Sequence, residues 1–208
     1  MKWQIGLISL LLGANTAFAQ SSSGGSINIP FPVRVSIFAG NQLSQNNLSS
    51  AFTKTINHIA YGADLNIPIR QIYFTAGVTG WMIPSEFFLV GPYVGYAGSY
   101  TDIFLGVAVG EFKKTDVNSA INPIQTTTQS ATLGCGIVGL RQYFGSGFNF
   151  GAGITGFWCS SDKYTQEVQT GNYGTPVKTE IKEGSSAYGG LLYLMFFWND
   201  TGRYMKDY

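Results

Sequence analysis

ATLGCGIVGLRQYFGSGFNFGAGITGFW, which spans residues 131–158, decides the fold. It predicts two strands of about ten residues each, joined by a turn at Gly145-Ser146-Gly147. In both arms apolar side chains alternate with glycine and small polar residues. A period of two with one apolar face is typical of tilted strands that cross a membrane. We therefore expect two sets to face lipid: Ala131, Leu133, Cys135 and Ile137 in the first arm, and Phe148, Phe150, Ala152, Ile154 and Trp158 in the second.

The beginning of the chain predicts a secretory signal peptide. Lys2 supplies a positive start, and residues 5–12 form a short apolar core. Ala17-Phe18-Ala19 is a small-x-small cleavage site before Gln20. The apolar run is too short to be a membrane helix. We therefore expect the mature chain to be exported.

The composition favours a membrane protein built from strands. Charged residues make up 11% of the chain, aromatic residues 15%, and 27 residues are glycine. Lys2 leaves with the signal, so 11 basic and 11 acidic residues remain in the mature chain. The chain has no cluster of basic residues, so we do not expect nucleic acid as a partner. No mature stretch reaches the ~20 apolar residues of a membrane helix. Strands that cross lipid must close into a barrel, because lipid leaves unpaired backbone groups unsatisfied.

The same alternation recurs along the chain and predicts an all-β, eight-stranded antiparallel up-and-down transmembrane β-barrel. The expected organisation is a signal peptide at 1–19, an N-terminal periplasmic segment at 20–32, the barrel at 33–198 and a C-terminal tail at 199–208. Pro92 falls inside the expected fourth strand and removes a ladder donor, so we expect a bulge there. Glycines are expected to face the lumen at 62, 77, 91, 95, 106, 110, 134, 136, 151 and 153.

The expected connections alternate between long and short ones. Long polar loops are predicted at 41–55, 113–127 and 160–184, and tight turns join the strands at the opposite end. This asymmetry predicts short periplasmic turns and longer extracellular loops, with both termini in the periplasm. Aromatic residues are expected to mark an outer rim (Phe38, Trp81, Phe87, Phe88, Phe112, Trp158, Tyr188) and an inner rim (Tyr73, Tyr100, Phe104, Tyr143, Phe148, Trp198).

With this pattern, and with the short features Tyr61-Gly62-Ala63-Asp64 and Gly139-Leu140-Arg141-Gln142-Tyr143-Phe144, the chain resembles the small eight-stranded outer-membrane barrels of the opacity and porin-family type. The resemblance implies a location in the bacterial outer membrane and one of several tasks: adhesin, structural barrel or narrow channel. The chain departs from the pattern of a last strand that ends at a C-terminal aromatic residue. NDTGRYMKDY follows Trp198, so either this tail extends the last strand or residues 189–198 carry the assembly signal.

Three polar side chains are expected inside the barrel. If the first two strands pair across the 41–55 loop, Arg34 lies opposite Asp64, and an ion pair there would act as a structural strut or as a gate. His58, the one histidine, shares this inward face and is expected to be a polar lumen residue. A catalytic set with Ser36 and Asp64 would be needed for an acyl-chain enzyme, and no motif connects these residues. We expect no catalytic residue, cofactor or metal site.

The two cysteines are expected to be free thiols. Cys135 and Cys159 lie on adjacent strands of an exported protein, which favours a disulfide. The expected facing places Cys135 toward lipid and Cys159 toward the lumen, and side chains on opposite faces cannot bridge. The lumen itself is narrow enough for side chains to plug it, although its glycines would also allow a narrow apolar passage.

The longest loop predicts a polar hairpin above the membrane. Tyr164, Gln166 and Val168 alternate before the bend at residues 170–176, and Val177, Thr179 and Ile181 alternate after it. Tyr164 and Tyr173 are expected to contact partners. The expected function is surface interaction, adhesion or envelope structure through such loops, without enzymatic activity. The alternatives are a narrow channel for small, including apolar, solutes and, third, a lipid acyl-chain enzyme. Expected partners are outer-membrane lipid, lipopolysaccharide and an extracellular ligand or host surface.

Overall fold

The computed structural model describes residues 33–47, 53–69, 72–120, 123–144, 149–171 and 174–199. All belong to one compact unit, Pro32–Tyr208. The expected signal peptide and most of the C-terminal tail lie outside the described residues. Within them, no helix has the length and apolar character to cross a membrane. The strands are β1 (Arg34–Asn47), β2 (Thr53–Ile69), β3 (Phe74–Ile83), β4 (Phe87–Ala97), β5 (Thr101–Asn118), β6 (Gln125–Phe144), β7 (Phe150–Ser161), β8 (Tyr164–Thr170), β9 (Val177–Ile181) and β10 (Ser185–Asn199).

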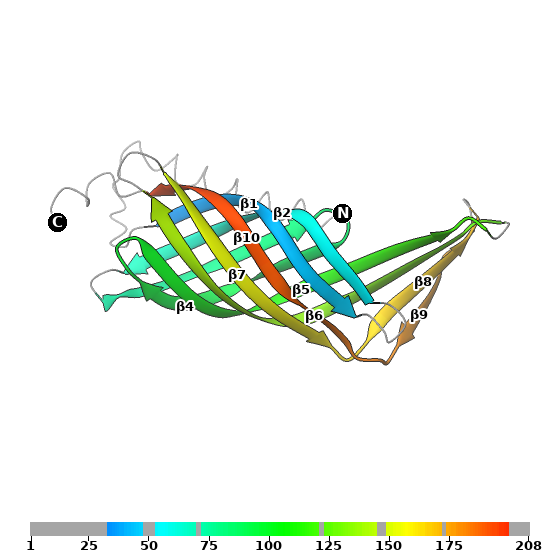
Figure 1. Ribbon diagram of the computed structural model, residues 1–208. Helices are drawn as coiled ribbons and strands as arrows, with labels where there is room; N and C mark the ends of the chain where they lie inside the picture. Colours follow the sequence, from blue (N-terminus) through cyan, green and yellow to red (C-terminus); the bar gives the residue numbers. More distant parts are fainter. Residues whose placement is uncertain are drawn as a thin grey trace, which may run out of the picture. The chain divides into compact units, whose positions relative to one another are not determined.

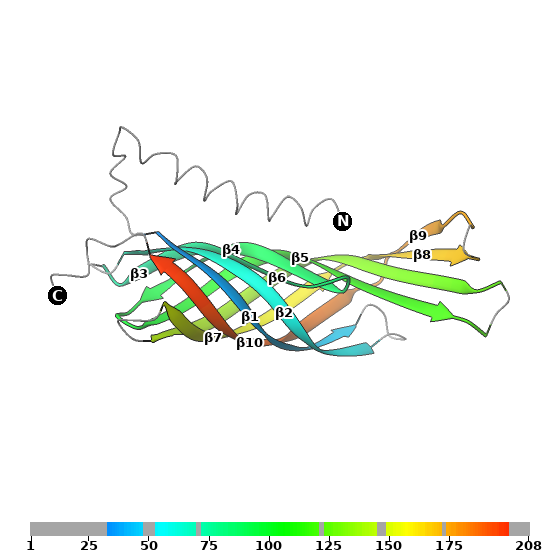
Figure 2. The same cartoon turned by 90° about the horizontal axis from the view of Figure 1, so that it is seen from above.

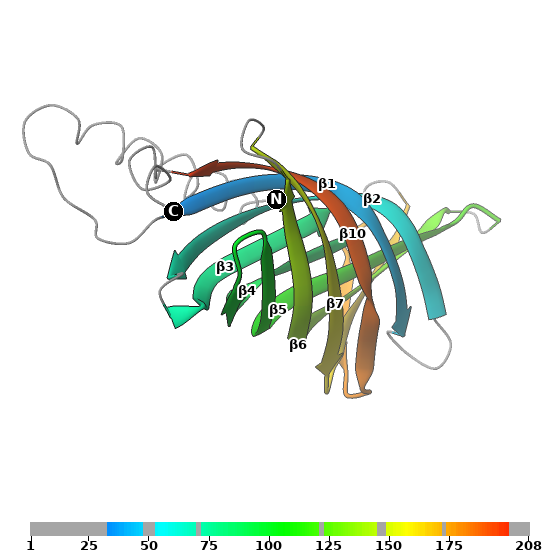
Figure 3. The same cartoon turned by 60° about the vertical axis from the view of Figure 1, so that its left-hand side comes forward.

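Eight of these strands close into a ring. Each strand from β1 to β5 pairs antiparallel with the next, β5 pairs with β6, β6 with β7, β7 with β10, and β10 with β1 (Figures 1 and 3). The up-and-down barrel predicted from the sequence is confirmed. We call the end where β1 begins and β10 ends the near rim, and the opposite end the far rim.

The outer face of the ring is apolar. Large hydrophobic side chains on the outward positions are exposed, among them Leu105, Val107, Ile154 and Leu192, each more than half accessible. Inward positions of the same strands are buried, as the patterns of β1, β5 and β7 show. The predicted facing is therefore confirmed for these strands. An apolar exterior on a closed ring is the arrangement that lipid requires.

The predicted facing of β6 is wrong. Ala131, Leu133, Cys135 and Ile137, expected against lipid, are at most 6% accessible and face the lumen. Val138, Leu140 and Phe144 face outward instead. The reason is that Arg141 has the same parity as the first set, and a guanidinium turned into the lipid belt is destabilising, by as much as about 2–4 kcal/mol at its middle. Gly134 and Gly136 consequently lie on the outer face and not in the lumen.

The two predicted aromatic rims are only partly present, because many rings fill the lumen. Trp158, Tyr188, Tyr73, Tyr100 and Trp198 are exposed as a rim would require. The expected rim residues that are instead buried are Phe38, Trp81, Phe87, Phe112, Phe104 and Tyr143. Phe148 lies outside the described residues.

Glycines make room for these rings. A Cβ atom built on Gly62 would overlap the Phe38 ring, one on Gly139 the Phe104 ring, and one on Gly153 the Tyr193 ring. Each aromatic side chain thus covers a glycine of another strand. The glycine-rich inner wall is what allows an eight-stranded lumen to hold so many large side chains.

The loops predicted at 41–55 and 113–127 are shorter than expected. β1 continues to Asn47 and pairs with β2 from Thr53, and β5 and β6 remain paired out to Asn118 and Gln125. The bulge predicted at Pro92 does not form. The β4–β5 register is the same on both sides of Pro92, with Val90 opposite Val109 and Tyr93 opposite Gly106. Pro92 removes ladder contacts without inserting an extra residue.

Beyond the far rim, four strands form a projecting sheet that we call the arm. It contains the far ends of β5 and β6, with β8 paired to β6 and β9 paired to β8. Figures 1 and 2 show these strands continuing past the end of the other barrel strands. The hairpin predicted for the longest loop is confirmed, with Tyr164 opposite Ile181 and Val168 opposite Val177.

Candidate functional site

Two buried ion pairs cross the lumen close to the near rim. Arg141 Nη2 lies 2.8 Å from Asp64 Oδ1, and Arg34 Nη1 lies 3.2 Å from Asp102 Oδ2. All four side chains are at most 4% accessible. Asp64 and Arg141 come from β2 and β6, and Arg34 and Asp102 from β1 and β5, so each pair joins strands four places apart in the eight-strand ring. The two pairs therefore span the diameter of the barrel.

Hydroxyl and amide groups complete the hydrogen bonding of the acids. Tyr143 donates its hydroxyl to Asp102 at 2.7 Å, and Asn66 donates to the same oxygen at 3.3 Å. Tyr93 donates to Asp64 at 3.1 Å and accepts from Arg141 Nη1 at 2.7 Å. Buried charges are tolerated only when they are paired and hydrogen-bonded in this way.

Aromatic rings cover the two guanidinium groups. The Arg34 guanidinium carbon lies 3.9 Å from the centre of the Tyr143 ring, and that of Arg141 lies 4.2 Å from the centre of the Phe104 ring. Arg141 also donates to the Tyr193 hydroxyl at 3.2 Å. Flat contacts with rings together with forked hydrogen bonds are what arginine offers and lysine does not.

The expected direct pairing of Arg34 with Asp64 is corrected by this geometry. Asp64 lies opposite Ser36 in the ladder and Arg34 lies opposite Asn66, a shift of two residues from the expected register. Both side chains do face the lumen, as predicted. Asp64 nevertheless pairs with Arg141, and Arg34 pairs with Asp102, each on the opposite wall of the barrel. Loop length alone could not fix the register, because β1 and β2 extend into the segment expected to be a loop.

A second layer of the lumen, on the far-rim side of the two ion pairs, is apolar. Trp81 on β3 packs edge-on against Phe157 on β7, with ring centres 5.9 Å apart, and these strands are again opposite each other in the ring. Trp81 Nε1 donates to Gln42 Oε1 at 2.8 Å. Phe87 packs against the same Phe157 ring, with ring centres 5.3 Å apart. Leu89, Ile137 and Leu191 are among the other fully buried core side chains.

Cys135 and Cys159 form a disulfide, which corrects the expectation of free thiols. They lie directly opposite each other on β6 and β7, and both are buried in the lumen. The error follows from the wrong facing assigned to β6, since two inward side chains in register can bridge. The disulfide lies at the far end of the β6–β7 ladder, next to the point where β6 exchanges β7 for β8 as its partner.

His58 is not enclosed in the lumen. It has the inward parity of β2, but its side chain is 50% accessible, and its Nδ1 lies 3.7 Å from Glu86 Oε2. Ser36 lies opposite Asp64, whereas His58 lies opposite Gln42, six residues further along β1. Six strand residues span about 20 Å. Ser36 and His58 are therefore not assembled into a catalytic set with Asp64.

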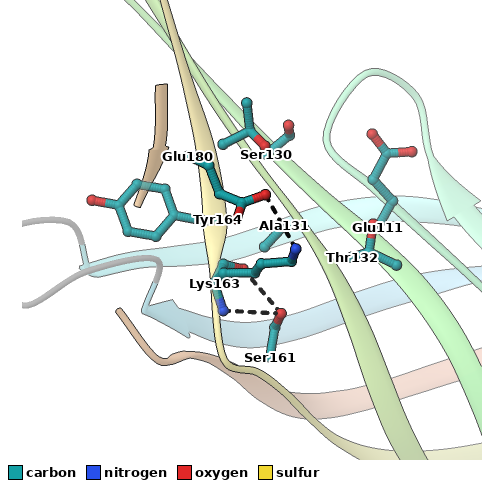
Figure 4. Close-up of a pocket in the computed structure, with 9 residues that line it drawn as sticks. Glu111, Ser130, Ala131, Thr132, Ser161, Lys163, Tyr164 and Glu180 are labelled. Carbon is teal, nitrogen blue, oxygen red and sulfur yellow. Dashed lines mark hydrogen bonds and ion pairs between the residues drawn. The ribbon is translucent and has the colours of Figure 1, made fainter. Parts of the chain in front are cut away.

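The base of the arm holds a small pocket of about 110 Å³ between β5, β6 and the β7–β8 turn (Figure 4). Lys163 reaches Glu180 at 3.1 Å, and the Ser161 hydroxyl donates to the Lys163 carbonyl at 2.9 Å. Tyr164, expected to contact partners, is 5% accessible and belongs to the hydrophobic core. It packs at the base of the arm, where it is not accessible to a partner. Tyr173 lies outside the described residues.

Arg141 and Asp102 were not anticipated as site residues. Arg141 is the only charged residue between Ala131 and Trp158, and its parity matched the face assigned to lipid. That conflict was the available signal, because an arginine in a transmembrane strand belongs inside the barrel. The sequence pattern predicts a turn at Thr101-Asp102, whereas Asp102 is the second residue of β5. In the described part of the chain, no three His, Cys, Asp or Glu side chains are grouped as metal ligands would be.

No protein-family model and no curated protein sequence matches this chain. Its fold is similar to that of a major outer membrane protein of Thermus thermophilus, with a TM-score of 0.56, 9% identity, and coverage of 80% of this chain and 99% of that chain. The outer membrane protease OmpT of Escherichia coli aligns with a TM-score of 0.47 and 8% identity over 84% and 100% of the two chains. The N-terminal β-barrel domain of OprF from Pseudomonas aeruginosa aligns with a TM-score of 0.36 and 15% identity over 80% and 97%.

The first of these likenesses agrees with the closed ring and with its apolar exterior. The chain has the fold of an outer-membrane β-barrel, and a barrel of this kind belongs in the bacterial outer membrane.

Proposed function

We propose that this protein is a non-enzymatic outer-membrane barrel whose arm makes contact with another surface. The observation that carries the proposal is the arm itself, a sheet of four strands that projects beyond the far rim. Short connections in outer-membrane barrels face the periplasm, so the far rim and the arm face the outside of the cell.

The arm has the chemistry of a contact surface that stays soluble. Its strands carry threonine and glutamine, and Lys178 and Glu167 pair between β9 and β8. Lys163, in the β7–β8 turn, pairs with Glu180 on β9. Tyr164 and Ile181 pack its base against the barrel core. A rigid base with a polar, solvated sheet above it presents backbone edges and side chains in fixed positions, which lowers the entropic cost of binding.

The lumen supports this proposal over a channel. Two ion pairs and the Trp81–Phe157 contact each join opposite sides of the ring. A solute would have to break a buried, fully hydrogen-bonded ion pair to pass, which costs several kcal/mol. The barrel is therefore proposed as a plugged support for the arm.

A shortened arm tests the proposal. Removal of residues 166–178 leaves the ring strands intact, so the variant should insert and show heat-modifiable migration on gels as the full chain does. Bacteria that display each form would be applied to protein-coated, glycan-coated and bacteria-coated surfaces. The full chain should raise retention on at least one surface, and the shortened form should not. Equal retention by both folded forms on all three surfaces would refute a contact role for the arm.

Planar bilayer recordings test the plugged lumen. The full chain should give no stable single-channel conductance, and Arg141→Ala with Asp64→Ala should open a small one. Steady conductance by the full chain would favour the channel instead.

A further inference from the structure

β9 presents an unpaired edge to the surroundings. It is the last strand of the sheet and pairs on one side with β8, and no described strand pairs with its other side. Its first four residues are exposed and Ile181 is half-buried. An open strand edge offers a row of backbone N–H and C=O groups that another strand can extend.

The sequence of this edge is complementary to itself. β9 reads VKTEI, so an antiparallel copy centred on Thr179 places Val177 opposite Ile181 and Lys178 opposite Glu180. Two Lys–Glu pairs then lie on one face of the joined sheet, and two Val–Ile pairs flank a Thr–Thr pair on the other. We propose that the partner of this edge is β9 of a second copy of the protein; the inference rests on the contact role proposed for the arm.

Only one register of the pairing satisfies the charges. A shift of two residues in one direction places Lys178 opposite itself, and a shift in the other direction places Glu180 opposite itself. Like charges directly opposite each other destabilise strand pairs. A shift of one residue would place odd-numbered residues opposite even-numbered ones. Residues whose backbone N–H and C=O groups point to the open edge would then lie opposite residues whose groups point back to β8, and the ladder could not form. The centred register avoids all three conflicts.

The charges are available for this contact. Lys178 lies 3.4 Å from Glu167 and Glu180 lies 3.1 Å from Lys163, and the side chains of Lys178 and Glu180 remain more than half accessible. Exposed pairs of this kind contribute little to stability. Each charge can therefore accept a second partner across the edge without a large loss.

The antiparallel arrangement fixes which membranes are joined. β9 runs from the tip of the arm back toward the barrel, and Figures 1 and 2 both show the arm pointing away from the far rim. Two such strands side by side in opposite directions place the two barrels at opposite ends. The copies therefore belong to facing membranes, and the pairing links one outer membrane to another.

Charge reversal in two separate populations tests the proposal. Full-length protein would be placed in lipid vesicles that carry one of two dyes, and mixed clusters would be counted. Wild-type vesicles should cluster. Lys178→Glu alone and Glu180→Lys alone should lose clustering to the level of empty vesicles, since each opposes like charges at both positions. A mixture of the two single variants should cluster again, because each then meets the complement of its own charge.

Lys178→Glu with Glu180→Lys in one chain should also cluster with itself. This variant breaks both pairs within the arm, so its recovery cannot come from the stability of a single copy. Heat-modifiable migration confirms that every variant is folded. Failure of the mixture to cluster while wild-type vesicles do would overturn the pairing.

Cross-linking tests the register and the membranes that are joined. Thr179→Cys should form a disulfide-linked dimer between two dye populations, whereas Val117→Cys, exposed on β5, should not. A Thr179 dimer formed equally in vesicles too dilute to cluster would place both copies in one membrane and refute the facing arrangement. If the shortened arm abolishes contact but the charge variants behave as wild type, the arm binds something other than β9 and the proposed function stands without this inference.

Discussion

Arg141 on β6 and Asp64 on β2 lie four strands apart in the eight-strand ring, and their side chains meet across the lumen at 2.8 Å. Asp64→Ala should leave Arg141 buried without its partner and destabilise the barrel by about 3–5 kcal/mol. The double variant Asp64→Ala with Arg141→Ala should recover part of this loss, and urea unfolding of refolded protein in detergent measures it. Strictly additive single and double variants would show that the two charges are not coupled.

The lipid face gives a second prediction. Val107→Arg turns a guanidinium into the middle of the apolar exterior and should destabilise by about 2–4 kcal/mol. Gly106→Arg, one residue away, should instead disturb the lumen, since even a Cβ atom there meets the Pro92 carbonyl and Tyr93. Lipid-mimetic detergents of different chain length should change the stability of the first variant more than that of the second. An unchanged urea midpoint for Val107→Arg would contradict the outward facing of β5.

The disulfide gives a third prediction. Cys135 and Cys159 close a loop with a sequence separation of 24 residues, for which chain entropy predicts about 3 kcal/mol of stabilisation. Neither sulfur should react with a maleimide reagent until the disulfide is reduced, because maleimides alkylate thiols and not disulfides. Burial of both side chains should make that reduction slow until the protein is unfolded. Cys135→Ser with Cys159→Ser should fold with a lower urea midpoint and with less protection of the arm from protease. Rapid labelling of native, unreduced protein would contradict the bond.

Two glycines on β6 provide a matched pair for the fourth prediction. Gly139 faces the lumen, where an added Cβ atom would overlap the enclosed Phe104 ring, and Gly136 faces outward beneath Trp158. Gly139→Ala should cost about 1–3 kcal/mol, because overpacked cores relax poorly. Gly136→Ala should cost less, since Trp158 is 59% accessible and can turn into the lipid. Equal losses would show that enclosure of the ring is not what decides the cost.

The period of two could be identified from the sequence because it is a local property. Alternation at residues such as Val33, Arg34, Val35 and Ser36 depends only on strand geometry, and the strand fold and the hairpin of the longest loop followed from it. The inward position of Asp64 followed for the same reason. The barrel class likewise followed from this recurring alternation and from the absence of a long apolar run between residues 33 and 198.

The disulfide and the partners of Arg34 and Asp64 were decided only by the closed ring. On β6, Leu133 and Ile137 suit either lipid or a packed lumen, so the charge of Arg141 is the one local feature that indicates the inward face. Closure fixes the packing of that face, because one set of side chains must fit a narrow interior together with those of seven other strands. The ion pairs join residues 77 and 68 positions apart in the chain. Such contacts depend on the stagger of every strand between them, and that stagger is a property of the whole barrel and not of any local stretch.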